Sequence, residues 1–134
     1  LCAKPVIDAL LGAATLARIE AKIDGLGALG YVYVRKYERE LPMRRYFVRA
    51  ASEGSEACPR VHLHGVALGS PIWREHLAFR DALRADVALR DRYARLKTEL
   101  ARRYADDKSA YTDAKAPFIR AAMDAALAAN PATP

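Results

Sequence analysis

Hydrophobic positions in the first half of the chain follow patterns that are typical of β-strands. An apolar run at residues 4–11, bounded by a proline and a glycine, predicts a buried strand. Residues 31–34 and 44–50 combine aromatic and β-branched side chains, and residues 60–68 alternate between apolar and polar positions. The pattern therefore predicts four strands before residue 70.

Helical spacing describes most of the remaining apolar positions. Positions 16, 19, 23 and 26 repeat at helical intervals after Thr15, which is expected to cap a helix that ends by Gly27 or Gly30. Ser70 and Pro71 carry the signals of a helix start, and helical patterns continue from there to residue 130. Strands with one helix, followed by a helical half, predict an α+β (α/β two-layer) fold.

Length and composition indicate one globular domain. The chain has 134 residues, of which 52% are hydrophobic and 28% charged, and it shows no bias typical of disorder. We expect a single domain over residues 1–134, sheet-rich over 1–69 and helical over 70–130. No apolar run reaches the length of about 18 residues that a membrane helix needs, so no membrane partner is expected. Because the chain begins at Leu1, directly before a predicted strand, we expect that an N-terminal segment is missing.

The cysteines and the net charge indicate which compartment and which class of ligand to expect. Cys2 and Cys58 are isolated, a pattern that favours buried thiols in a reduced, cytoplasmic compartment over a disulfide. The net charge of +6 is divided evenly between residues 1–70 and 71–134. A positive field favours anionic ligands, but solvated arginines spread over the surface also explain the excess. Nucleic acid is therefore not the expected partner.

His62-Leu63-His64 is the strongest candidate for chemistry in the sequence. Residues two apart in a strand lie on one face, so both imidazoles would project from the same side of a sheet. Paired imidazoles can hold a divalent cation or contact a phosphate. The alternative is a pair of histidines that make structural hydrogen bonds on a half-exposed face.

Asp8 and several basic residues complete the candidate site. If its strand is a neighbour, Asp8 would add a carboxylate to the two histidines and form a recognised type of open metal site. Its alternatives are helix capping or pairing with an arginine. Lys4, Arg44 and Arg45 are candidates for binding phosphate, because basic side chains, and guanidinium groups above all, bind oxyanions. Their alternative role is simple surface charge.

Several segments of the chain resemble the GrpB family, a bacterial group with a nucleotidyltransferase-like fold. The resemblance is carried by AKPVID at residues 3–8, LPMRRYFV at 41–48, VHLHGV at 61–66 and WREHLAFRDALR at 73–84, followed by Tyr93 with Leu96-Lys97 and by Tyr111 with Lys115 and Phe118. The match keeps the family's order and covers nearly the whole chain. GrpB-like domains also resemble the segment fused behind the kinase domain of some bacterial dephospho-CoA kinases, although this chain has no kinase P-loop.

The resemblance implies a mixed sheet flanked by helices, with Asp8 near the metal-binding acid of nucleotidyltransferases. It places His62 and His64 near the position of a second acid. In such enzymes two carboxylates hold Mg²⁺ on the nucleotide phosphates. This chain departs from that pattern, because Val6 and Leu10 stand two residues either side of Asp8 and leave no Asp-x-Asp pair. The Gly-Ser turn that family members carry before the Ala-Lys-Pro run would fall upstream of the first residue.

Three functions are compatible with these observations. The first is binding of a nucleotide or phosphorylated small molecule with Mg²⁺ or another divalent cation held by Asp8, His62 and His64, with Asp8 as the catalytic carboxylate of a nucleotidyl transfer. The second is a non-catalytic accessory or interaction domain with a protein partner, which the missing second acid favours. The third is an RNA-binding module, against which the even charge distribution counts.

Overall fold

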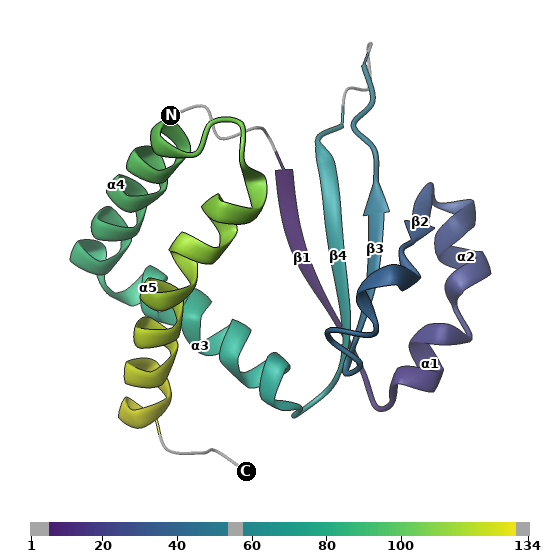
Figure 1. Cartoon of the computed structure of the whole chain (residues 1–134). Coiled ribbons are helices and arrows are strands. Elements are labelled where there is room, and N and C mark those ends of the chain that lie inside the picture. The colour runs from purple at the N-terminus through teal and green to yellow at the C-terminus, as the bar shows by residue number, and fades with distance from the viewer. Residues whose placement is uncertain (1–5, 54–57, 131–134) are drawn as a thin grey trace. The chain divides into compact units, whose positions relative to one another are not determined.

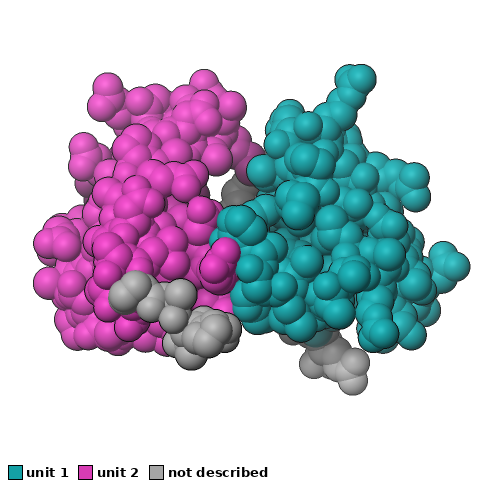
Figure 2. Space-filling view, turned by 90° about the horizontal axis from the view of Figure 1, so that it is seen from below, with its two compact units in different colours: residues 1–73 teal, residues 74–134 magenta. Residues whose placement is uncertain are grey.

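The chain forms two compact units, Leu1–Trp73 and Arg74–Pro134 (Figure 2). The computed structural model describes residues 6–53 and 58–130 (Figure 1). Strands and short helices make up the first unit, and helices make up the second. No helix within the two described ranges is both long and apolar enough to cross a membrane.

Four strands build the sheet of the first unit. They are β1 (Val6–Ala13), β2 (Tyr31–Tyr33), β3 (Arg44–Arg49) and β4 (Arg60–Ala67). Their order in the sheet is β1-β4-β3-β2, with β1 parallel to β4 and β3 antiparallel to both of its neighbours. The predicted α+β fold with a mixed sheet, flanking helices and a helical C-terminal half is therefore confirmed, and β1 is an edge strand.

Two short helices occupy the segment for which one helix is predicted. They are α1 (Leu16–Glu20), which lies against β1, β3 and β4, and α2 (Ile23–Ala28), which lies against β2. Thr15 caps α1 as expected, because its hydroxyl accepts a hydrogen bond from the backbone N–H of Arg18 at 3.4 Å. Gly30 follows α2 with φ at +85°, a left-handed conformation that favours glycine. We call the side of the sheet under these helices the covered face.

Much of the core of the first unit lies on the covered face, although Val66 of β4 is fully buried on the opposite face. Phe47 of β3 is 0% exposed, and Ile19 of α1 and Val61 of β4 are also buried. Gly65 lets α1 approach the sheet closely, because a Cβ at this position would lie only 3.0 Å from Ile19 Cγ2. Phe47 also stacks on Tyr33, with ring centroids 4.9 Å apart. This packing gives the strands a rigid backing on one side.

Three longer helices complete the chain. They are α3 (Pro71–Ala85), α4 (Val87–Arg103) and α5 (Lys108–Ala129). Ser70 caps α3 as predicted, since its hydroxyl accepts a hydrogen bond from the backbone N–H of Trp73 at 3.3 Å. Asp86 and Asp107 cap α4 and α5 through their carboxylates.

Aromatic packing joins the helices of the second unit. Tyr93 of α4 stacks on Phe118 of α5 with ring centroids 5.5 Å apart, and Phe79 of α3 meets Tyr93 edge-on at 5.4 Å. Leu100 of α4 and Met123 of α5 are buried. The apolar stripe of α4 therefore serves the core of this unit.

Cys58 corrects one expectation from the sequence, because its side chain is exposed rather than buried. It lies in the connection between β3 and β4, where it forms an isolated bridge with Ser52 outside the sheet. Connecting segments run over the protein surface, so the thiol stays exposed to solvent. Cys2 lies outside the described residues.

Candidate functional site

Side chains of three strands gather on the side of the sheet opposite the covered face. Asp8 of β1 is in register with His62 of β4, and Tyr46 of β3 is in register with His64. Register partners and residues two apart in a strand lie on the same face, so Arg44 joins them. We call Asp8, Arg44, Tyr46, His62 and His64 the polar sheet face.

The structure brings Asp8 against both histidines. Its Oδ1 lies 3.4 Å from Nδ1 of His62 and 3.5 Å from Nε2 of His64. The Asp8 side chain is 70% exposed, whereas those of His62 and His64 are 21% and 18% exposed. The expectation of a buried strand is wrong at Asp8, because β1 lies at the edge of the sheet. The carboxylate is consequently accessible to a ligand.

Arg44 determines which nitrogen of His64 carries the proton. Nη1 of Arg44 lies 3.3 Å from Nδ1 of His64. A guanidinium group only donates hydrogen bonds, so Nδ1 must accept and the proton of the neutral ring is on Nε2, which faces Asp8. Guanidinium, imidazole and carboxylate thus form a connected series across β3, β4 and β1.

Tyrosine rings lie beside the histidines. The ring of Tyr46 is 5.7 Å from that of His62 and 5.2 Å from that of His64, between centroids, and the Arg44 guanidinium lies 5.2 Å from the Tyr46 centroid. Tyr37, in the short 3₁₀ helix η1 (Arg35–Tyr37), meets Tyr46 edge-on at 5.7 Å. Neither tyrosine is among the site residues predicted from the sequence. Tyr46 could have been found from its position two residues after Arg44 in one strand, because such residues share a face of the sheet.

These contacts hold the pKa of Asp8 below its ordinary value of 3.8. The largest cause is the hydrogen bond with His64, and partial burial acts in the opposite direction. The positive charge that either imidazole carries when it is protonated adds to the lowering. Burial lowers the pKa of Arg44 and raises the pKa of Tyr46. Asp8 is therefore an anion at neutral pH, surrounded by nitrogen donors.

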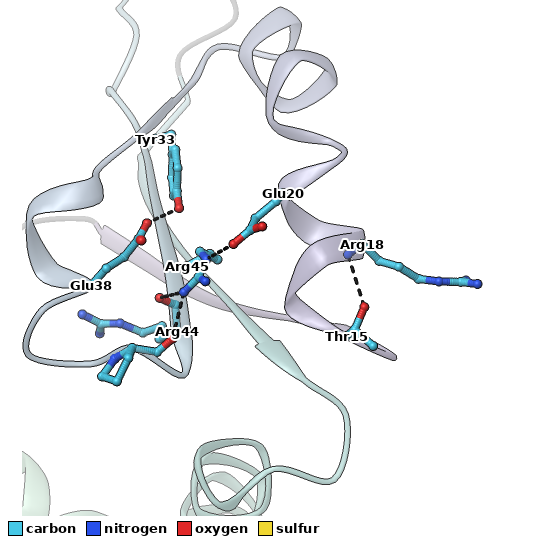
Figure 3. A network of polar contacts seen from close by, with 8 residues as sticks. Thr15, Arg18, Glu20, Tyr33, Glu38, Arg44 and Arg45 are labelled. Carbon is cyan, nitrogen blue, oxygen red and sulfur yellow. Dashed lines mark hydrogen bonds and ion pairs between the residues drawn. The ribbon is translucent and has the colours of Figure 1, made fainter.

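The predicted phosphate-binding residues do not all reach this face. Arg45 lies on the covered face, where its Nε is 2.7 Å from Oε1 of Glu20 and its Nη1 donates to the carbonyl of Pro42 at 2.9 Å. Figure 3 shows the side chain of Arg44 extending away from this network, while its backbone carbonyl accepts a hydrogen bond from Nη1 of Arg45 at 3.3 Å. Consecutive strand residues project to opposite faces, so the two arginines do not act on one ligand. Lys4 lies outside the described residues.

Tyr33 and Glu38 form a second polar contact near Arg45 (Figure 3). The hydroxyl of Tyr33 donates to the carboxylate of Glu38 (Figure 3). Burial, with a further contribution from this carboxylate, raises the pKa of Tyr33 to about 12. The hydroxyl therefore keeps its proton at neutral pH, and the network links β2 and β3 to α1 and the η1 segment.

The metal-ligating atoms that the polar sheet face offers suit a cation that carries other ligands with it, such as phosphate oxygens and water. Within residues 6–53 and 58–130, no group of three or more His, Cys, Asp and Glu side chains is arranged to hold a metal ion. His64 also presents a proton, not a lone pair, to Asp8. Mg²⁺ needs no such cage, because it binds one or two carboxylates and completes its shell with phosphate oxygens and water. Asp8 can supply that carboxylate.

Comparisons with known proteins agree on one family. The model of the family described as GrpB protein matches residues 1–125. YqkA of Bacillus subtilis (strain 168) is 31% identical over 124 residues, which cover 92% of this chain and 34% of that protein. The glutamate-rich protein GrpB of Alkalihalophilus pseudofirmus is 31% identical over 119 residues, which cover 87% of this chain and 66% of that protein. The chain thus spans from about one third to just under two thirds of the length of these relatives.

A solved structure is similar to this chain in fold as well as sequence. The crystal structure of the conserved protein GrpB from Enterococcus faecalis matches with a TM-score of 0.75 and 28% identity, covering 95% of this chain and 72% of that chain. The likeness includes strands and helices from both units. The chain therefore belongs to the GrpB family.

Proposed function

We propose that the polar sheet face binds a nucleotide or another phosphorylated small molecule together with a divalent cation. The observation that supports this function is the convergence of Asp8, Arg44, His62 and His64 on one partly exposed face of three strands. The set combines an anionic oxygen, which suits a cation, with nitrogen donors, which suit phosphate oxygens.

Charge complementarity explains why cation and phosphate would bind together. A phosphate alone would be repelled by the Asp8 carboxylate, and a cation alone would face the Arg44 guanidinium. A cation that is already bound to phosphate oxygens presents positive charge to Asp8 and leaves negative oxygens for Arg44. Mg²⁺ would neutralise phosphate charge, Asp8 would hold the cation, and His62 and His64 would hold the Asp8 carboxylate in place.

The proposal extends to nucleotidyl transfer, for which Asp8 would be the catalytic carboxylate. Such transfer commonly uses two acids that share the metal ions. Positions 6 and 10 project from the same side of β1 as Asp8, and they hold Val6 and Leu10. This observation favours a second function, a non-catalytic accessory or interaction domain with a protein partner. Consumption of a nucleoside triphosphate by the purified chain distinguishes the two.

Thermal unfolding tests ligand binding directly. The purified chain is heated with ATP, GTP, CTP, UTP or inorganic pyrophosphate, each in Mg²⁺ and each in EDTA. A ligand at one hundred times its Kd stabilises a protein by about 2.7 kcal/mol, which raises the Tm of a chain of this size by roughly 10 °C. We expect this shift for at least one ligand in Mg²⁺, and a smaller shift or none in EDTA.

Two matched variants separate the site from general charge effects. Asp8→Asn and Asp24→Asn each replace an exposed carboxylate of the first unit with an amide, but Asp24 belongs to α2 on the covered face. Asp8→Asn should abolish the Mg²⁺-dependent shift, and Asp24→Asn should keep it. A shift that survives in Asp8→Asn contradicts the site. No shift with any ligand, and no triphosphate consumed by a folded sample, would support the accessory domain instead.

A further inference from the structure

An apolar pocket lies on the covered face, between β1 and the two short helices. Its volume is about 410 Å³, which is within the range of roughly 300–1,000 Å³ for small-molecule sites. Leu11 of β1 and Ile19 of α1 line its inner part, and Leu26 and Leu29 line it from α2 and the residue after it. Leu29 is 67% exposed, so the apolar surface continues out to the rim. An exposed apolar patch that leads into a pocket marks a binding surface.

The charged residues that line this pocket are both cations. Arg18 belongs to α1, and Lys22 lies one helical turn further along the chain, just before α2. Both are exposed, so their aliphatic stems can contact the pocket while their charged ends stay in water. A pocket of this kind complements an apolar ligand that carries a single anionic group at one end.

We propose that this pocket binds a free aliphatic carboxylate. Its alkyl chain would lie against Leu11, Ile19 and Leu26, and its carboxylate would lie at the rim near Arg18 and Lys22. A ligand with a polar body is disfavoured, because polar groups buried among these side chains would lose hydrogen bonds to water without replacement.

This pocket is independent of the polar sheet face. Leu11 and Ala13 occupy alternate positions of β1, and they project to the side opposite Asp8. The two sites therefore lie on opposite faces of one sheet. Loss of phosphate-ligand binding in Asp8→Asn should leave carboxylate binding unchanged, so that either proposal can fail without the other.

Calorimetric titration with straight-chain carboxylates measures the proposed binding. Hexanoate, octanoate and decanoate are used below their micellar concentrations, with acetate and the uncharged decanol as reference ligands. Affinity should rise by up to about fourfold for each added methylene, the equivalent of ~0.8 kcal/mol of apolar burial. Acetate should not bind measurably. Decanoate should bind more tightly than decanol, because only decanoate has a charge for the two cations.

Two glycines of α2 provide a matched pair of blocking variants. A Cβ added at Gly25 or at Gly27 would meet nothing within 4 Å, but only Gly25 lines the pocket. Gly25→Phe should lower decanoate affinity at least tenfold by filling the pocket, and Gly27→Phe should change it less than twofold. Neither variant should lose helical structure, since glycine is a poorer helix former than phenylalanine. Far-UV circular dichroism and urea unfolding confirm that both variants fold.

Charge removal tests the carboxylate end of the ligand. Arg18→Gln and Lys22→Gln should each weaken decanoate binding by about 1.5- to 5-fold at low salt, the range of exposed ion pairs, and leave decanol binding unchanged. The proposal is overturned if the unaltered chain binds no decanoate at millimolar concentration. It is also overturned if Gly25→Phe binds as tightly as Gly27→Phe, or if decanoate and decanol bind equally.

Discussion

The two faces of the sheet are built from alternate residues of the same strands, yet their polar groups are satisfied in different ways. On the covered face, Arg45 is only 14% exposed and contacts both Glu20 and the carbonyl of Pro42. On the polar sheet face, Arg44 contacts a histidine, and the carboxylate of Asp8 is largely exposed. Two arginines that are adjacent in the sequence thus have different surroundings.

This difference separates stability from binding. Away from the apolar pocket, side chains on the covered face are held by protein groups and by packing against α1, so replacing them should mainly change the free energy of unfolding. Side chains on the polar sheet face keep exposed atoms that can still accept or donate hydrogen bonds, so replacing them should mainly change ligand binding. Four predictions test this division, beginning with the largest effect.

Phe47→Ala should give the largest loss of stability. Phe47 is fully buried against Tyr33 and the core, and truncation of such a residue costs about 3–5 kcal/mol through lost burial and a residual cavity. Urea unfolding followed by circular dichroism measures the change. Tyr46→Ala is the matched truncation on the polar sheet face, and it should cost less than half as much. Equal losses would show that the two faces contribute equally to the core.

Gly65→Ala should destabilise by about 1–3 kcal/mol, the cost of overpacking. A Cβ at Gly65 would lie 3.0 Å and 3.2 Å from two carbons of Ile19 and 3.4 Å from the carbonyl oxygen of Arg45, so α1 must move. Gly27→Ala is the control, since a Cβ there has open space and should leave stability unchanged or raise it by up to about 1 kcal/mol. A neutral Gly65→Ala would contradict close packing of α1 on β4.

Arg45→Met should lower stability by about 1–2 kcal/mol. It removes the hydrogen bonds to Glu20 and Pro42, and partial exposure of Glu20 keeps the loss below that of a buried charge pair. Arg44→Met, the same replacement one residue earlier, should cost less in urea unfolding and instead weaken the binding of phosphorylated ligands. The reverse order of the two stability losses would disprove the division between the faces.

Asp8→Asn should have the smallest effect on stability, within about 1 kcal/mol at neutral pH, as for exposed ion pairs. Because the pKa of Asp8 is lowered below 3.8 in the folded chain, its ionised form stabilises the fold above that pH. That contribution is lost as the pH falls through the folded value. The stability difference between the unaltered chain and Asp8→Asn should therefore shrink between pH 5 and pH 2.

A second variant tests the cause of that pH dependence. The hydrogen bond with His64 is the largest cause of the lowered pKa of Asp8. In a His64→Ala background, the loss of stability caused by Asp8→Asn should therefore depend less on pH than it does in the unaltered chain. Urea unfolding at a series of pH values measures both differences. An unchanged acid dependence in the His64→Ala background would mean that His64 does not lower the pKa of Asp8.

Most of the secondary structure could be predicted because its signals are local. The alternation at residues 60–68 corresponds to β4 at Arg60–Ala67, and the caps at Thr15 and Ser70 start α1 and α3. Such signals depend on side chains one to four positions apart, which the sequence lists in order. The predicted helix after Thr15 is interrupted between α1 and α2, in a segment whose glycines weaken helical propensity.

The sequence by itself determined that His62 and His64 share a face, because the period of a strand requires it. Only the tertiary structure decided that β1 lies parallel to β4 in the register that places Asp8 beside them, and that β1 is at the edge. It also decided that α1 covers Arg45 and leaves Arg44 on the other side. Strand neighbours and covered faces depend on how distant segments pack together, and no local pattern specifies that packing.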